Sequence, residues 1–125
     1  MSAITITNSG LNLLRDGVSG ANTPKITYVA LGTSSTAPAA TDTQLGAESF
    51  RKAVTSYTNG ASTGEVLINM YLGPGDDVGD SIAEVGFFGG NATGTANSGV
   101  LLAHGLYSHT KLGTESIQFQ LDLTI

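Results

Sequence analysis

Residues 117–125 alternate strictly between apolar and polar side chains, and this pattern constrains the fold more than any other in the sequence. Successive side chains of a β-strand point to opposite sides, so the alternation gives one apolar and one polar face. A strand with one dry and one wet face is typical of an antiparallel sheet that covers a core. The apolar members are Ile117, Phe119, Leu121, Leu123 and Ile125.

Short strand-like segments separated by glycine-rich turns recur along the rest of the chain. We expect strands at about 25–31, 48–57, 65–72, 82–88, 100–107 and 115–124. No helical segments alternate with them, which argues against a parallel sheet. The prediction is one domain over residues 1–125 with a mainly β (α+β) fold: an antiparallel sheet or sandwich of about six strands with one N-terminal helix.

The helix is predicted at about 8–19. Thr7 and Asn8 are residue types that cap a helix start, and a glycine at position 20 suits the left-handed conformation that ends one. Leu11, Leu14 and Val18 recur at helical spacing, so we expect this face to pack on the sheet.

Composition argues against several classes of function. The five basic residues are scattered and outnumbered by ten acidic ones, whereas a nucleic-acid binder needs a concentrated cationic patch. There is no cysteine, and hence neither a disulfide nor a Cys-based zinc site. The start of the chain lacks the basic and apolar regions of a signal peptide, and no apolar run reaches the ~20 residues of a membrane helix. We expect synthesis in a cytoplasm and no membrane partner.

No catalytic, cofactor or metal site is predicted. None of the serines lies in a Gly-x-Ser-x-Gly motif. His104 and His109 are five residues apart, which places them on opposite faces of a straight strand, so a shared metal would need a bend or a symmetry axis. Asp76, Asp77 and Asp80 crowd a glycine-rich turn but lack the EF-hand pattern, which favours a solvated acidic turn.

Glu48 and Glu84, each beside apolar residues, are candidates for a carboxylate pair in acid–base chemistry. Arg51 follows Glu48 by three residues, and a structural ion pair between these two explains both charges more simply. We therefore expect a Glu48–Arg51 ion pair and no enzyme activity.

Several short motifs follow one another along most of the chain. The most specific is the stretch 82–88, Ile-Ala-Glu-Val-Gly-Phe-Phe. The other segments, in chain order, are Thr7-Asn8-Ser9-Gly10 with Leu11 and Leu14, 26–32, the loop around Pro38, Glu48-Ser49-Phe50-Arg51 and 99–103. This order of motifs resembles the N-terminal domain of phage tail-collar and tail-fibre proteins, which attaches a fibre to the baseplate. The stretch 82–88 is similar to that family's Ile-x-Glu-Leu-Gly-Leu-Tyr.

The resemblance implies a structural protein of a phage virion, in the tail or baseplate, that acts as a fibre-attachment or connector module. Its partners would be other tail or baseplate proteins. In the family a long shaft and a receptor-binding tip usually follow this domain, and the 125 residues contain neither, so attachment is the part that carries over. The alternatives are a capsid decoration protein and a small carbohydrate-binding module that uses Tyr57, Tyr71 or Tyr107 to stack sugars.

A homo-oligomer is also expected, with a trimer suspected because fibres of the family are threefold. Strands 82–88 and 100–107 are apolar on both faces, which is more than a one-sided sheet needs. Part of that surplus could meet a neighbouring copy. Alternatively, both strands are fully internal. The interface candidates are Phe87, Phe88, Leu101 and Leu102.

Overall fold

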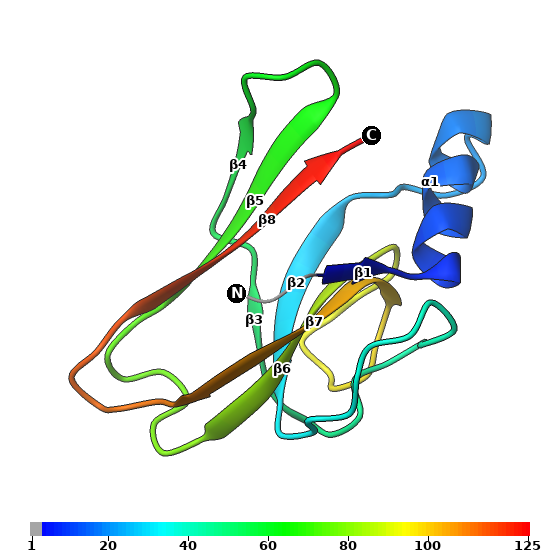
Figure 1. Ribbon diagram of the computed structural model, residues 1–125. Coiled ribbons are helices and arrows are strands. Elements are labelled where there is room, and N and C mark those ends of the chain that lie inside the picture. Colours follow the sequence, from blue (N-terminus) through cyan, green and yellow to red (C-terminus); the bar gives the residue numbers. More distant parts are fainter. Residues whose placement is uncertain (1–3) are drawn as a thin grey trace.

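The computed structural model describes residues 4–125 and contains, within them, one helix and eight strands (Figure 1). All strand pairs are antiparallel. The mainly β fold with one N-terminal helix is therefore confirmed. The elements are β1 (Ile4–Ile6), α1 (Asn8–Ser19), β2 (Ile26–Gly32), β3 (Glu48–Ala53), β4 (Ser56–Asn59), β5 (Glu65–Leu72), β6 (Ser81–Gly89), β7 (Val100–Thr110) and β8 (Ile117–Thr124).

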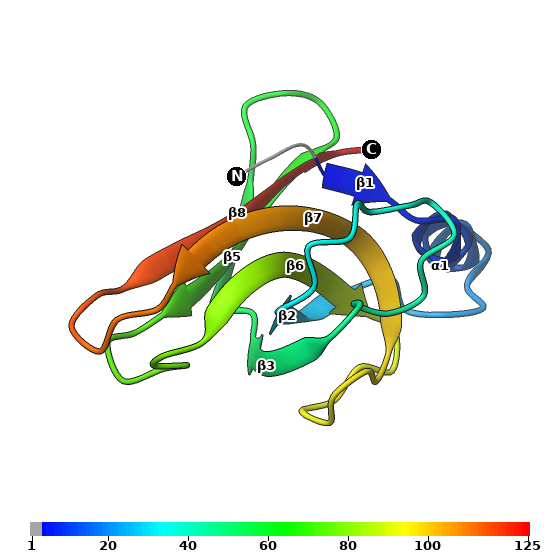
Figure 2. The ribbon, with the colours of Figure 1, turned by 60° about the horizontal axis from the view of Figure 1, so that its bottom comes forward.

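The strands form two sheets. The large sheet has the order β1-β7-β6-β2-β3, and the small sheet has the order β4-β5-β8. In Figure 2 the central strands β6 and β7 arch strongly. Shifts of register between Ile82 and Glu84 and between Phe87 and Phe88 accompany the arch, as bulges bend a strand.

The main core lies between the sheets. It takes alternate residues of β5 and β8, as the period of two predicts, and these meet buried residues of β2, β6 and β7. This packing removes large aliphatic and aromatic side chains from water, which is the main source of stability for such a sandwich. The members with no exposed surface are Val29, Leu31, Met70, Leu72, Val85, Phe87, Leu102 and Ala103.

The opposite face of the large sheet is covered by two long loops, residues 33–47 and 90–99. Leu45 of the 33–47 loop packs with Phe88, Leu101 and Ala30 in a second buried cluster, and Ala92 of the 90–99 loop packs against it. The large sheet is thus buried on both faces, by the small sheet on one side and by loops on the other.

This double covering corrects the expected interface. Phe87, Phe88, Leu101 and Leu102 are each 0% exposed. Phe87 and Leu102 belong to the core between the sheets, and Phe88 and Leu101 belong to the cluster under the loops. The apolar side chains on both faces of these two strands are therefore buried within the fold, and none of the four can contact a second copy.

Helix α1 begins and ends where predicted but packs through a different face. The Thr7 hydroxyl accepts a hydrogen bond from the N–H of Gly10 at 2.9 Å, and Gly20 closes the helix in the left-handed conformation, with φ 82°. The buried residues are Gly10 and Leu13. Leu11 and Val18 are 55% and 92% exposed, so the expected packing face is wrong for these two.

Close approach of the helix to β7 explains the difference. A Cβ on Gly10 would lie 2.7 Å from both Cα and O of Leu102, so only glycine fits there. The backbone N–H of Thr7 also donates to the Leu102 carbonyl at 3.0 Å. The helix therefore turns Gly10 and Leu13 toward the sheet, and Leu11 and Val18 remain exposed.

The expected strand 48–57 is two strands. Val54 still donates its N–H to Thr27 of β2, at 2.9 Å, whereas the next residue, Thr55, donates to Asn69 of β5, at 2.7 Å. The chain thus passes from the large sheet to the small one within a single peptide unit. The short β1 was not predicted, and β7 extends to Thr110, three residues beyond the expected end.

Candidate functional site

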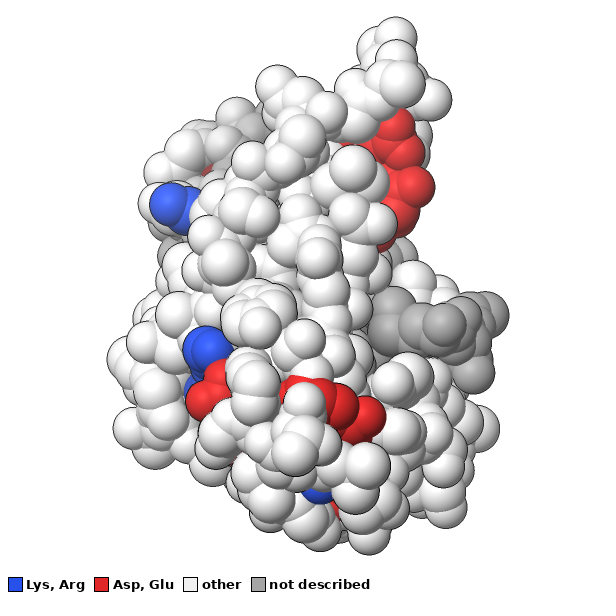
Figure 3. Space-filling view, turned by 90° about the vertical axis from the view of Figure 1, so that its left-hand side faces the viewer, with Lys and Arg blue, Asp and Glu red and all other residues white. Residues whose placement is uncertain are grey.

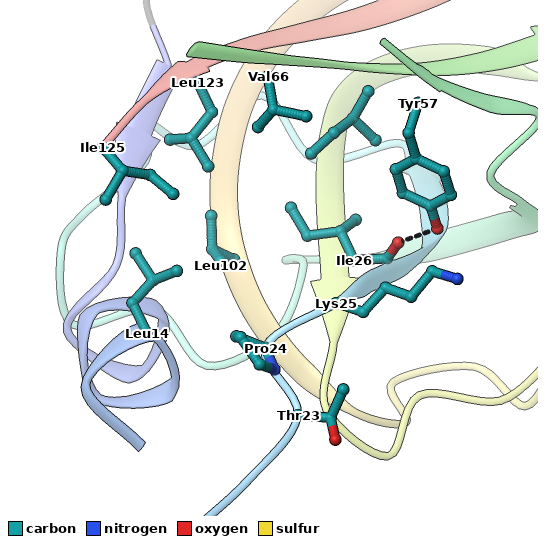
Figure 4. A pocket seen from close by; sticks show the side chains of 11 residues that line it. Leu14, Thr23, Pro24, Lys25, Ile26, Tyr57, Val66, Leu102, Leu123 and Ile125 are labelled. Carbon is teal, nitrogen blue, oxygen red and sulfur yellow. Dashed lines mark hydrogen bonds between the residues drawn. The ribbon is translucent and has the colours of Figure 1, made fainter. Parts of the chain in front are cut away.

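An apolar groove of about 310 Å³ opens where α1, the start of β2 and the small sheet meet. Figure 4 shows its side chains converging from these elements, with Leu14 on the helix side and Val66, Leu123 and Ile125 above. The volume falls at the lower end of the range for small-molecule pockets. The groove is lined by Leu14, Thr23, Pro24, Lys25, Ile26, Tyr57, Val66, Ile68, Leu102, Leu123 and Ile125.

The floor of the groove is buried and its rim is exposed. Ile26, Ile68 and Leu102 are at most 3% exposed, whereas Ile125 at the rim is 77% exposed. Leu123 is paired with Val66 across β8 and β5, so these two form one wall. A buried apolar floor beneath an exposed apolar rim suits the side chain of a hydrophobic partner.

The polar groups at the rim already have partners. The Tyr57 hydroxyl donates a hydrogen bond to the Ile26 carbonyl, drawn as a dashed line in Figure 4. Burial raises the pKa of this hydroxyl above its ordinary value of 10.0. The ammonium of Lys25 lies 5.1 Å from the centre of the Tyr57 ring, within cation–π range. The groove therefore presents apolar surface and one cation at its edge.

Sequence reasoning missed this groove. Its residues come from six separate segments, and each looks like an ordinary core or loop residue in the sequence. The one available signal was Ile125, which continues the apolar side of the last strand one residue past its end at Thr124.

The carboxylate of Glu84 is the centre of a buried polar cluster on the other face of the large sheet. Glu84 is 0% exposed and accepts hydrogen bonds from the backbone N–H groups of Ser34, Gly46 and Ala47 at 3.1, 2.9 and 2.8 Å. These donors are at both ends of the 33–47 loop. A charged acceptor that gathers several N–H groups compensates its own burial, and here it closes the loop over the sheet.

His104 extends this cluster. Its Nε2 lies 2.9 Å from Glu84 Oε1, and its Nδ1 lies 2.9 Å from Asp42 Oδ2. The pKa of Asp42 is lowered, first by the backbone N–H of Ala39 and then by His104. Both ring nitrogens of His104 are held by carboxylates within the fold, so this arrangement fastens the loop and leaves no ring nitrogen for a substrate. A hollow of about 80 Å³ beside it accommodates little more than water.

The predicted ion pair between Glu48 and Arg51 is confirmed. Arg51 Nε lies 2.9 Å from Glu48 Oε2, and Nη2 lies 3.0 Å from Oε1, which is a bidentate pair. The two side chains are 2% and 3% exposed. Glu48 and Glu84 both flank Gly32 in the sheet, yet each carboxylate has its own partners, so they do not act as a pair.

The acidic turn and the second histidine have structural partners. Asp76 accepts from Lys52 at 2.6 Å, and His109 Nε2 lies 2.6 Å from Glu115. Burial and a hydrogen bond with Asp80 raise the pKa of Asp77 to about 7. Within residues 4–125, no three His, Asp or Glu side chains come together in a way that could hold a metal ion.

The outer face of the small sheet is polar and carries little charge. Asn69 Oδ1 accepts hydrogen bonds from Gln118 and Gln120 at 2.8 and 2.9 Å, and Tyr71 beside them is 46% exposed. The left-hand side of Figure 1, seen face-on in Figure 3, shows its charged atoms in a few small groups among uncharged surface. Tyr107, another candidate for sugar stacking, packs edge-on against Phe119 of the core, and their ring centres are 5.2 Å apart.

Comparison of the chain with protein-family models and with curated proteins finds no match. In the part of the chain that the structure describes, residues 4–125, no helix has the length and apolarity needed to cross a membrane.

Proposed function

We propose that this protein is a non-catalytic structural module of a bacteriophage tail or baseplate, which attaches or connects a fibre by receiving an apolar anchor of another tail protein in its groove. Both the order of the motifs and the geometry of the groove support this role.

The observation that carries the proposal is what the resembling residues do in the fold. Thr7 caps the helix, Glu84 closes the 33–47 loop, and Arg51 holds Glu48 and the 90–99 loop. Each of these polar groups forms its hydrogen bonds within the protein and stabilises the fold. A motif set of this kind favours a rigid binding module over an active site, because an active site needs groups free to meet a substrate.

The groove supplies the contact that such a module needs. Its lining is apolar apart from three rim residues, and hydrophobic anchors in well-packed pockets provide most of the affinity of protein interfaces. The low fraction of charged residues, 12% against about 25% in typical proteins, lowers the cost of covering the surrounding surface.

Mass spectrometry of separated tails and capsids, from virions that carry this gene, tests the role. We expect the protein in the tail fraction. Its absence from tails would contradict the proposal, and its presence on capsids would favour a decoration protein.

Two matched variants test the groove within the same virions. Ile125→Arg places a charge at the groove rim, and Val18→Arg places the same charge on an exposed helix position outside the lining. We expect Ile125→Arg to be lost from assembled tails while Val18→Arg is retained, with equal melting temperatures for the free proteins. Equal incorporation of the two variants would exclude the groove as the attachment point.

A carbohydrate-binding module is the second candidate, favoured by the exposed ring of Tyr71 beside the amides of Gln118 and Gln120. Sugar sites combine an exposed aromatic face with amide hydrogen-bond groups. Glycan-array binding that is lost in Tyr71→Ala and kept in Tyr71→Phe would support it, since phenylalanine preserves the stacking ring. No binding by the unmodified protein would exclude this second candidate.

A further inference from the structure

Strand β8 forms a long and unprotected edge of the small sheet. It pairs with β5 over eight residues in unbroken register, from Glu65↔Thr124 to Leu72↔Ile117. Among residues 4–125, no strand pairs with its other side. An edge of this length is a template for another strand, and natural proteins usually blunt such edges with lysine, proline, bulges or short strands.

The other three sheet edges carry those devices. β1 has three residues and β4 has four. β3 carries Arg51 and Lys52, and its pairing with β2 shifts register between Leu31 and Gly32. β8, with the sequence Ile-Gln-Phe-Gln-Leu-Asp-Leu-Thr, has no lysine, arginine, proline or register shift. Strand β8 is therefore the sheet edge, within residues 4–125, whose unpaired backbone groups are the least protected from pairing with another strand.

One hydrogen bond shows which residues of β8 point their backbone N–H and C=O groups toward β5 and which point them outward. Ile125 donates its N–H to Gly64 at 3.0 Å, on the β5 side. Because backbone groups of a strand alternate in direction, the odd-numbered residues bond to β5, and Gln118, Gln120, Asp122 and Thr124 direct N–H and C=O outward. A hollow of about 260 Å³, lined by Tyr107 and residues 117–120, lies beside the strand and gives room for side chains of an added one.

We propose that β8 pairs with β8 of a second copy, antiparallel about a twofold axis at Gln120, to make one continuous six-stranded sheet. This register places Gln120 opposite Gln120, Gln118 opposite Asp122 and Ile117 opposite Leu123. It matches outward backbone groups with outward backbone groups, polar faces with polar faces and apolar faces with apolar faces. No like charges are directly opposed, because Asp122 is the single charged residue of the strand.

The inference stands apart from the proposed tail function, since it rests on the edge itself. It also differs from the suspected trimer, because a twofold contact closes with two copies. The mass of the free protein therefore separates the two possibilities, whatever the role in a virion.

Sedimentation equilibrium of the purified chain, with Gln120→Pro and Gln120→Ala as matched variants, tests the pairing. Both variants lose the side-chain hydrogen bond to Asn69, but only proline removes the outward N–H. In the proposed dimer the Gln120 N–H of each copy donates to the Gln120 carbonyl of the other, so proline removes two hydrogen bonds at the axis. We expect dimers for the unmodified chain and Gln120→Ala at roughly 100 µM, and at least about tenfold weaker association for Gln120→Pro. Proline is tolerated at an edge strand, and melting curves establish that the variant is folded.

A charge variant gives an independent readout. Gln120→Lys would place two ammonium groups opposite each other at the axis, so we expect dissociation at low salt and recovery near 1 M salt, where screening is nearly complete. A monomer or a trimer of the unmodified chain would overturn the proposal. So would a dimer that survives Gln120→Pro, or one that Gln120→Ala also abolishes.

Discussion

The guanidinium of Arg51 lies 4.4 Å from the centre of the Phe88 ring and covers it. The same side chain donates through Nη1 to the carbonyls of Thr93 and Ser98 at 2.9 and 3.0 Å, while its other nitrogens hold Glu48. One planar cation thus joins strand β3, the ring beneath it and the 90–99 loop.

Arg51→Lys is expected to destabilise the protein by about 2–4 kcal/mol, because an ammonium reproduces neither the bidentate pair nor the stacking and leaves Glu48 poorly compensated while buried. Urea unfolding followed by circular dichroism measures the loss. Arg15→Lys is the control, since that arginine is 68% exposed and pairs with Asp16 at the surface; a change below about 0.5 kcal/mol is expected there. Equal effects of the two substitutions would contradict the role given to Arg51.

Glu84→Gln is expected to loosen the 33–47 loop and to cost about 2–4 kcal/mol. The amide nitrogen of glutamine cannot accept from the N–H groups that the carboxylate gathers, and the remaining bonds lose their charge assistance. Hydrogen exchange should rise at Ser34, Gly46 and Ala47. Glu115→Gln, at a partly exposed site, should cost much less. Unchanged protection of the three amides would show that the loop is held by something else.

Gly10→Ala should destabilise the protein and Asn12→Ala should not, although both substitutions raise helix propensity. The new methyl at position 10 meets the backbone of Leu102 at 2.7 Å, so we expect a loss of about 1–3 kcal/mol by overpacking. Asn12 is exposed, and its replacement should leave stability unchanged or slightly higher. Thermal unfolding of both variants decides this, and a stabilised Gly10→Ala protein would refute the close helix–strand contact.

Asp77 should make stability fall as pH rises. Its folded pKa of about 7 exceeds its ordinary 3.8, so the folded chain holds this proton more tightly than the unfolded chain. The stabilisation is complete below the unfolded pKa and is lost as pH rises through about 7. Asp77→Asn, which stays uncharged, should melt higher than the unmodified protein at about pH 8 and show a flatter pH dependence.

Asp76→Asn should change the melting temperature in the opposite direction to Asp77→Asn. The pKa of Asp76 is lowered, chiefly by its hydrogen bond from Lys52, so its charged form is the stabilising one. This variant should melt lower than the unmodified protein at about pH 8, with a difference that shrinks as the pH falls below 4 or so. Parallel curves for the two asparagine variants would exclude the assigned titrations.

The pattern of β8 predicted its core face correctly because a period of two reports burial directly, residue by residue. The helix ends were also predictable, since Thr7 and Gly20 act through their own backbone. The helix face was not, because it depends on the distance between Gly10 and a residue more than ninety positions away. The same reason hides the groove and the Glu84–His104–Asp42 cluster, whose members meet only after the sheets and loops have folded.

The pairing of β8 with β5 has a mechanical consequence, which would matter in the proposed connector role. A pull on Ile125 along the strand axis would load every hydrogen bond between β8 and β5 simultaneously, in shear, and β8 could not be extracted one bond at a time. A pull on Ile4 would meet the three residue pairs that join β1 to β7. The two ends of the described chain should therefore yield at different forces, with the Ile125 end the stronger attachment under tension.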